Sequence, residues 1–425
     1  MMALFPVLFV IGYAMIALEH PLKINKSASA LVLGSFLWLL WFIVSGDTAA
    51  ASSELSKSLE SVSSIIFFLM GAMAIVAVVD SYDGFSIITS RIKTNNLRTL
   101  LWIISWITFF MSAVLDNMTT AIVMVTLTRK LLSKPKDRKF FAGMIIVAAN
   151  AGGAASPIGD VTTTMLWIGG QISALGILER VGIASILNLL VPLLFVTRIL
   201  KGPVRSIAEQ KELERKKASH WDRNLVFISG IGGLVLVPIY RTVFGIPPYV
   251  GMLLSLGFLW FLTEILLRKK DNETVKQFGI SSLLTKVDLP SILFFTGILF
   301  AVGVLEANGQ LGALANMLQQ KIGNLQIIVM AIGVLSSVVD NVPLVAATMG
   351  MYPLSTYPMD SLLWEFTAYC AGTGGSILII GSAAGVATMG IEKISFGWYL
   401  RWIAPFALLG FLAGAGAYLL LRAFA

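Results

Sequence analysis

The sequence has little charge, one cysteine and two histidines. Only 13% of its 425 residues are charged, while 57% are hydrophobic. Soluble domains carry about twice that charged fraction. The single cysteine, Cys370, excludes a disulfide framework and a cysteine-based zinc site. His20 and His220 lie outside the apolar runs and have no ligand-like neighbours in the sequence, so no bound cofactor is expected.

What the sequence has instead is long apolar runs. The mean hydropathy is +0.85, and many runs reach the roughly 20 residues that a membrane-spanning helix needs. This pattern predicts an all-α polytopic membrane protein. The expected runs are 2–18, 28–45, 63–80, 99–128, 140–168, 177–198, 225–240, 249–267, 288–305, 324–352, 362–390 and 398–421.

The positive charge is concentrated between these runs. The net charge is +8, and 26 of the 31 lysines and arginines fall in six connecting segments. Such a bias is typical of the cytoplasmic loops of membrane proteins. We therefore expect a lipid bilayer as the partner and no nucleic acid. The six segments are 19–27, 81–98, 129–139, 198–224, 268–288 and 391–401.

The charge of the segments that flank two of the apolar runs predicts two re-entrant hairpins. Segments 81–98 and 129–139 are both basic, so the run 99–128 between them has to enter and leave on the same face. The two flanks of the run 324–352 together hold one lysine, so this second hairpin dips in from the opposite face. The ten remaining runs then alternate, and both termini lie outside.

Internal similarity predicts that the two halves are inverted repeats. Residues 71–80 align with 297–306 at an offset of 226, and Asp116-Asn117 aligns with Asp340-Asn341 at 224. Asn150-Ala-Gly-Gly aligns with Gly372-Thr-Gly-Gly at 222. We expect two inverted-topology repeats, each with five crossings, one re-entrant hairpin and one broken helix. Their expected limits are 1–198 and 225–425, joined by a basic cytoplasmic linker over 199–224.

The two Asp-Asn pairs mark the predicted centre. A carboxylate in an apolar run needs a partner, a proton or a cation, so Asp116 and Asp340 are candidates for a functional site. Both fall at predicted hairpin tips, where non-helical backbone is tolerated if it is buried in protein or faces water. Ser112 and Ser336 each precede their Asp by four residues and share its helix face.

The predicted broken helices add further oxygen ligands. Gly152-Gly153 and Ser156-Pro157 interrupt the run 140–168, and Gly374-Gly375 interrupts the run 362–390. Unpaired carbonyls at such breaks suit cations. The candidate transport-site residues are Asp116, Asn117, Asn150, Ser156, Asp160, Thr162, Thr163, Asp340, Asn341, Thr373 and Ser376. All of them are hard oxygen donors, which suit Na+ or Li+.

Several of these residues also have a structural interpretation. Asn, Ser and Thr in membrane helices often only hydrogen-bond a neighbouring helix, and glycine pairs often mark close packing. Asp160 is placed to cap the second half of its broken helix. Asp80 and Glu306 correspond across the repeat but lie at the ends of crossings, where an interfacial role is the alternative.

Three segments resemble the NhaD-type sodium/proton antiporters of the ion transporter superfamily, which is related to arsenite permeases and sodium–dicarboxylate symporters. The segments are 68–73 with Asp80, 113–120 and 150–163. The resemblance implies pH-sensitive exchange of Na+ or Li+ for H+ at the candidate residues above, in a homodimer of the bacterial inner membrane that serves pH homeostasis. Ala77 departs from the family pattern, because an acidic residue is expected there. If the carboxylate of that acidic residue contributes to pH sensing in the relatives, this chain lacks it.

The predicted function is cation/proton exchange by competition at buried carboxylates, without enzymatic activity. Burial raises the pKa of a carboxylate and a nearby cation lowers it, so protons and Na+ exclude one another at one site. The rival is a sodium-coupled anion symporter or an arsenite-type permease on the same fold. An anion between carboxylates is costly, which favours the exchanger. An intramembrane aspartyl protease is a weaker rival, because its motif fits 157–160 poorly and leaves the repeat unexplained.

Overall fold

The computed structural model describes residues 4–89, 94–200, 202–204, 218–268 and 270–424. Within these ranges the chain is helical, without a β-strand, and has one isolated bridge between Asn96 and Pro203. Seven of the described helices are long and apolar enough to cross a membrane. An eighth span results if the bent pair α17 (Gln310–Ile322) and α18 (Leu325–Leu335) is one crossing. The predicted all-α membrane class is confirmed.

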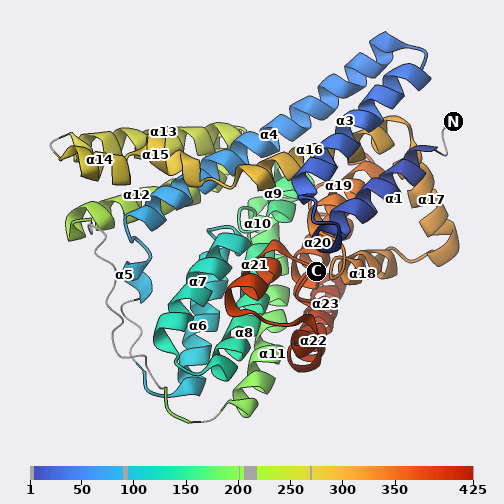
Figure 1. The fold of residues 1–425 in the computed structure, drawn as a ribbon. Coiled ribbons are helices and arrows are strands. Elements are labelled where there is room, and N and C mark those ends of the chain that lie inside the picture. The colour runs from blue at the N-terminus through green and yellow to red at the C-terminus, as the bar shows by residue number, and fades with distance from the viewer. Residues whose placement is uncertain (1–3, 90–93, 201, 205–217, 269, 425) are drawn as a thin grey trace.

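The long helices form one of two bundles, which runs across the upper part of Figure 1. In this long-helix bundle α3 packs along α16, and α4 packs against α12, α13 and α16. Its members are α1 (Leu4–Ala17), α2 (Glu19–Leu22), α3 (Lys26–Val44), α4 (Thr48–Ser81), α12 (His220–Phe244), α13 (Pro248–Leu267), α14 (Asn272–Phe278), α15 (Ile280–Leu283), the 3-10 turn Leu284–Lys286 and α16 (Leu289–Ala307).

The second, broken-helix bundle holds the predicted hairpins and broken helices and lies below the first in Figure 1. Here α8 packs against α6, α7 and α11, and α20 packs against α18. Its members are α6 (Leu97–Ser112), α7 (Asn117–Leu131), α8 (Pro135–Ala154), α9 (Val161–Ile168), α10 (Ala174–Gly176), the π turn Ile177–Val181, α11 (Gly182–Ile199), α18, α19 (Asn341–Met351), α20 (Leu362–Gly374), α21 (Ala383–Glu392), α22 (Phe396–Trp402) and α23 (Ala404–Phe424).

The two bundles meet along a seam. There α16 packs against α19, and α4 packs against α9. The short helix α5 (Ser86–Thr89) and the helix α17 lie in connections between the bundles. The seam therefore brings two long helices against the two helices that begin just after Asp160 and Asp340.

The chain breaks where the sequence predicts breaks. The run 99–128 is divided into α6 and α7 by a first tip at 113–116, and the run 324–352 into α18 and α19 by a second tip at 336–340; that these pairs are re-entrant hairpins stays a prediction. The runs 140–168 and 362–390 are divided at 155–160 and 375–382. An Asp at the start of α7 and of α19 explains the restart, because its carboxylate accepts a backbone N–H of the new helix.

Helix lengths differ from the hydropathy runs in two places. The run 63–80 is only the second half of α4, a helix of 34 residues that begins after Asp47. Asp47 caps it by accepting from the amides of Ala49 and Ala50, and the polar first half alternates serines with good helix formers (Ala, Leu, Glu and Lys), a mixture that a hydropathy window overlooks. The segment 306–323, expected as an outside flank, contains the amphipathic helix α17.

Three of the ten expected crossings are not single long apolar helices among the described residues. The run 2–18 appears as the 14 residues of α1. The runs 140–168 and 362–390 are each split by their break. The predicted linker 199–224 lies largely outside the described residues, and Val204 at its start donates its amide to the Asn95 carbonyl at 2.8 Å.

Candidate functional site

The first hairpin tip positions Asp116 at the start of α7. Asp116 accepts the amide of Thr119 at 2.8 Å through Oδ1. The Ser112 hydroxyl, at the end of α6, donates to the Ala149 carbonyl of α8 at 2.6 Å. The tip is thereby fixed both within the hairpin and to the broken helix beside it.

The second hairpin tip has the same local structure. Asp340 begins α19 and accepts the amide of Val342 at 3.3 Å. The Ser336 hydroxyl donates to the Ala371 carbonyl of α20 at 2.9 Å. Each predicted supporting serine therefore ties its hairpin tip to the neighbouring broken helix.

Glycines let hairpin and broken helix approach closely in both halves. A methyl group on Gly152 would overlap the Phe109 carbonyl, and one on Gly374 would overlap the Gly333 carbonyl. Gly159 and Gly381 lie equally close to the carbonyls of Ser112 and Ser337. These backbones are too close for any larger residue, which explains why both breaks are rich in glycine.

Amide side chains connect the two halves at the centre. The fully buried Asn150 accepts from Asn117 Nδ2 at 3.2 Å and donates to Ser382 Oγ at 3.0 Å. Asn341 donates to Asp160 Oδ2 at 3.1 Å. Four of the predicted site residues are thus joined by hydrogen bonds, and each hairpin tip reaches a broken helix.

Two carboxylate residues line one small cavity. Asp116 and Asp160 both line this cavity of about 20 Å³, whose remaining walls are mostly apolar side chains of α4, among them Phe68 and Val76, with Leu234 of α12 and Met252 of α13. A cavity of this size accommodates one water-sized particle. Among the described residues neither carboxylate forms an ion pair, so the protein itself supplies no described cation to this space.

The predicted hydroxyl ligands have a common arrangement. Thr163 donates to the Asp160 carbonyl at 3.0 Å, Thr373 to Tyr369 at 2.6 Å and Ser376 to Thr373 at 2.7 Å. Ser156 donates to the Ala113 carbonyl at the first tip. A hydroxyl that donates its proton keeps its lone pairs and can still coordinate a cation. Thr162 is fully buried, and its hydroxyl has no hydrogen-bond partner among the described residues.

Two neighbours of the site are not among the predicted ligands. Ser382 begins α21 and holds Asn150; it lies 222 positions after Asp160, the offset of that repeat landmark, and could have been found by extending the alignment. Lys26, the first residue of α3, places Nζ 3.6 Å from Asp340 Oδ2 and 4.4 Å from the centre of the Phe294 ring. In the sequence Lys26 is one basic residue of a loop segment, and no pattern distinguishes it.

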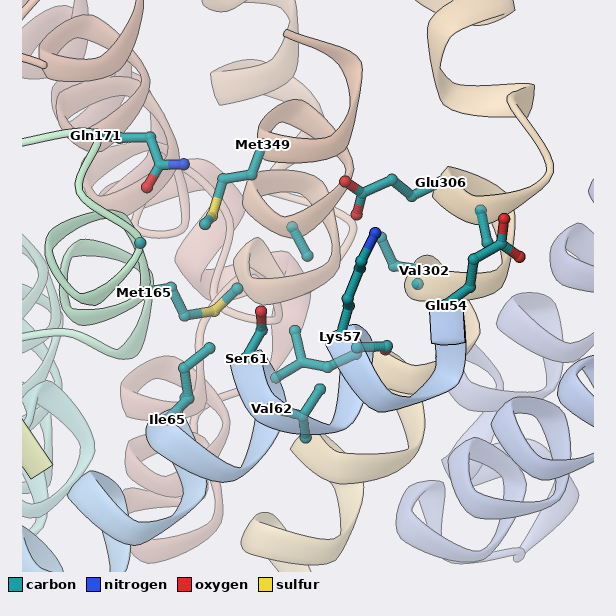
Figure 2. A pocket seen from close by; sticks show the side chains of 16 residues that line it. Glu54, Lys57, Ser61, Val62, Ile65, Met165, Gln171, Val302, Glu306 and Met349 are labelled. Atoms are coloured by element: carbon teal, nitrogen blue, oxygen red, sulfur yellow. The ribbon is translucent and has the colours of Figure 1, made fainter. Parts of the chain in front are cut away.

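A larger cavity opens at the seam, away from the carboxylates. It has a volume of about 360 Å³ and is lined by α4, α16, α19 and the end of α9. Figure 2 shows Lys57 of α4 pointing toward Glu306 of α16, with Gln171 and Met349 on the opposite wall. Glu306, which the sequence leaves without an assigned role, therefore faces a cavity between the bundles.

Two buried glutamates form ion pairs at the two ends of the second broken helix. Glu365 in the first turn of α20 lies 2.7 Å from Arg180 and accepts from the Tyr418 hydroxyl at 2.8 Å. Glu392 at the end of α21 pairs with Arg138 at 3.2 Å and Arg129 at 3.4 Å. Arg129, Arg138 and Arg180 all belong to the first half of the chain.

Known proteins resemble this chain along its whole length. It matches the family described as "CitMHS: Citrate transporter" over residues 13–368. Sodium/proton antiporter 1 of Arabidopsis thaliana is 46% identical over 419 residues, which cover 97% of this chain and 71% of the relative. Sodium/proton antiporter 2 of the same plant is 43% identical, with 98% and 99% covered. The Na(+)/H(+) antiporter NhaD of Vibrio cholerae is 32% identical, with 98% and 91% covered.

The membrane helices, the paired breaks and these matches define a multi-pass membrane transporter, which is not an enzyme. The chain belongs to the CitMHS citrate transporter family, as an NhaD-type member. The resemblance predicted from segments 68–80, 113–120 and 150–163 is confirmed.

Proposed function

We propose that the protein exchanges Na+ or Li+ for H+ across the membrane. The observation that carries the proposal is the small cavity of about 20 Å³ shared by Asp116 and Asp160. Two carboxylates without a described counter-cation in an apolar surrounding need protons or a metal cation to be neutral. The relatives named sodium/proton antiporters support the choice of Na+ and H+ as cargo.

Exchange follows because Na+ and protons exclude one another at the cavity that Asp116 and Asp160 share. When Na+ occupies the space, the oxygen atoms of Asp116 and Asp160 coordinate it and cannot hold protons. When protons bind, the negative charge that attracts Na+ is gone. The cavity has room for one water-sized particle and so for one Na+, and protons on the carboxylates remove the charge that would hold it there. Asp340, linked to Asp160 through Asn341, and the backbone-bonded hydroxyls of Thr163, Thr373 and Ser376 complete the proposed ligand set.

The organisation of the chain is part of the proposal. Two inverted repeats, 1–198 and 225–425, explain why Ser112 and Ser336, and Gly152 and Gly374, make matching contacts. We place the basic loops and the 199–224 linker on the cytoplasmic face of a bacterial inner membrane, with both termini outside. A homodimer belongs to this arrangement, with the long-helix bundle as its fixed part.

The seam gives a cation a route to the site. The cavity of about 360 Å³ reaches the C-terminal end of α9, whose N-terminal end carries Asp160. Glu54 and Glu306 outnumber Lys57 in its lining, and this net negative charge attracts cations into the cavity. Movement of the broken-helix bundle along the seam would then carry the site between the two faces of the membrane.

Anion transport is the rival, and the family description names citrate. The geometry opposes it, because a carboxylate substrate beside Asp116 and Asp160 would add negative charge to a site that is already negative. If the protein were a symporter, the same residues would hold the coupling Na+ and the anion would bind elsewhere. Succinate, citrate and arsenite uptake distinguish the two functions.

The test is proton exchange in everted membrane vesicles from a strain that lacks its own antiporters. A dye reports ΔpH while NaCl, LiCl, KCl or choline chloride is added at several pH values. We expect dequenching with Na+ and Li+, its loss in Asp116→Asn and Asp160→Asn, and normal exchange in Glu60→Gln, which removes an exposed carboxylate of α4. Undiminished exchange in both Asp variants would refute the proposed site, and uptake of succinate, citrate or arsenite without any cation-dependent dequenching would refute the exchanger.

A further inference from the structure

The ammonium group of Lys26 lies at the position that a cation would occupy beside Asp340. Nζ is 3.6 Å from Asp340 Oδ2, and the side chains of Lys26 and Asp340 are 31% and 21% exposed. The other carboxylate oxygen of Asp340 accepts the Val342 amide of its own helix. The lysine therefore occupies the side of the carboxylate that the helix cap leaves open.

Local helix stability does not explain a lysine at this position. Lys26 is the first residue of α3, where the positive end of the helix dipole repels a cation. The helix is capped without it, because Asn25 accepts from the Ser27 amide at 2.8 Å. Two groups from other elements hold the ammonium instead: the carboxylate of Asp340 and the face of the Phe294 ring on α16.

The pair also crosses the seam. Of the ion pairs that join described residues, Lys26–Asp340 is the one between the long-helix bundle and the broken-helix bundle. Asp340 continues through Asn341, which donates to Asp160 at the proposed cation cavity. Two side chains, those of Asp340 and Asn341, thus separate Lys26 from Asp160 at the cavity.

We infer that Lys26 is a built-in competitor of the transported cation. Its ammonium neutralises Asp340 when no metal cation is bound, and a cation that coordinates Asp340 displaces it from the carboxylate, so that only the Phe294 ring still holds it. Displacement also removes the ion pair that holds the second hairpin tip to α3 across the seam. This inference rests on the proposed function and assigns a specificity-determining role to a residue outside the ligand set.

Competition predicts an unusual result, namely that removing the residue tightens cargo binding. In Lys26→Gln, Asp340 has no resident cation, so the Na+ concentration for half-maximal exchange should fall by about fivefold, the value of a partly exposed ion pair. Lys26→Arg keeps a cation and should stay near the wild-type value. Lys23→Gln removes an exposed lysine three residues earlier and is the matched control. All variants are compared at one alkaline pH, because Asp160 and Tyr13 also lie near Asp340.

A binding measurement separates this inference from the proposed function. Na+ raises the melting temperature of a protein that binds it when folded. The Na+ concentration needed for a given rise should be lower in Lys26→Gln than in the wild type, and the difference should vanish when both carry Asp340→Asn. If the wild type shows no exchange, the proposed function fails, while this comparison still tests the competitor. An unchanged or weakened Na+ response in Lys26→Gln, or complete loss of exchange in a folded variant, overturns it.

Discussion

Asp116 and Asp340 begin their helices in the same way, yet their surroundings differ. Each follows a serine that donates to the carbonyl of the adjacent broken helix, and each caps the helix it starts. Asp116 then faces an apolar cavity shared with Asp160, whereas Asp340 meets the ammonium of Lys26. The difference comes from the long-helix bundle, which places Met252 of α13 beside the first tip and Lys26 of α3 beside the second.

One motif therefore stands in two different charge environments. The tips and breaks fix where a carboxylate stands, and a separate helix decides whether it has a resident cation. The two long-helix pairs also pack differently, since Gly297 of α16 meets the backbone of Ala30 of α3, whereas Gly71 of α4 meets the side chain of Met252 of α13. The asymmetry between the tips therefore lies both in the packing of the long helices and in the side chain that each pair brings to its tip.

The largest expected effect tests the shared part of the two halves. Gly152→Ala and Gly374→Ala each place a methyl group on a carbonyl of the facing helix, Phe109 or Gly333. We expect a loss of about 3 kcal/mol or more in stability and little folded protein in the membrane, measured by thermal melting in detergent. Gly257→Ala has open space around the added methyl and should melt normally. Normal melting of either site variant would show that its half tolerates separation of the two helices.

The next prediction separates the two aspartates. Asp116→Asn and Asp340→Asn should both reduce Na+/H+ exchange to background in vesicles while remaining in the membrane. Their stabilities should differ, because only Asp340→Asn leaves Lys26 without its carboxylate, at a cost of about 1 kcal/mol. Wild-type exchange in both variants would contradict the proposed site, and equal melting temperatures would show that the Lys26 pair adds no stability.

A smaller effect distinguishes the two asparagines. Asn341 donates to a carboxylate, whereas Asn117 donates to the amide of Asn150. Hydrogen bonds to charged groups contribute more than neutral ones. We expect the Na+ concentration for half-maximal exchange to rise about tenfold in Asn341→Ala and about threefold in Asn117→Ala. The reverse order would indicate that Asn150 lies nearer the cation than Asp160.

The smallest effect concerns the serines behind the tips. Ser112→Ala and Ser336→Ala each remove one buried hydrogen bond to a carbonyl, which contributes about 1 kcal/mol. Both should lower the melting temperature by about 1–2 °C with exchange retained. Ser105→Ala is the control, because its buried hydroxyl has no described partner to lose. A drop in only one half would mean that the two tips are held to their broken helices with different strength.

Local features of the sequence predicted the helix breaks and the residues that stand at them. Gly152-Gly153, Ser156-Pro157 and Gly374-Gly375 cannot continue a regular helix without loss, and the structure ends α8 and α20 there. Asp116 and Asp340 favour the first position before a helix, and α7 and α19 restart at the following residues. These features depend on neighbours in the chain, so a single sequence contains the information.

Contacts between distant helices were not predictable in the same way. Lys26 reaches Asp340 only because α3 packs on α16 and α16 packs on α19, and no local pattern encodes that combination. The cavity beside Glu306 likewise needs four elements in place. The polar first half of α4 was missed because amphipathic and polar helices have no long apolar run.

The ion pairs of Glu365 and Glu392 have a consequence for the order in which the chain is synthesised and inserted. Three of their arginine partners, in α7, α8 and the π turn 177–181, are synthesised before Glu365 and Glu392, while Arg422 of α23, 3.8 Å from Glu365, is synthesised after them. Each newly made glutamate therefore meets at least one counter-charge that is already in place, and its charge is not left unpaired at the membrane. Circular permutation that placed the second half first would leave Glu392 without an arginine until the first half was made, whereas Glu365 would still have Arg422.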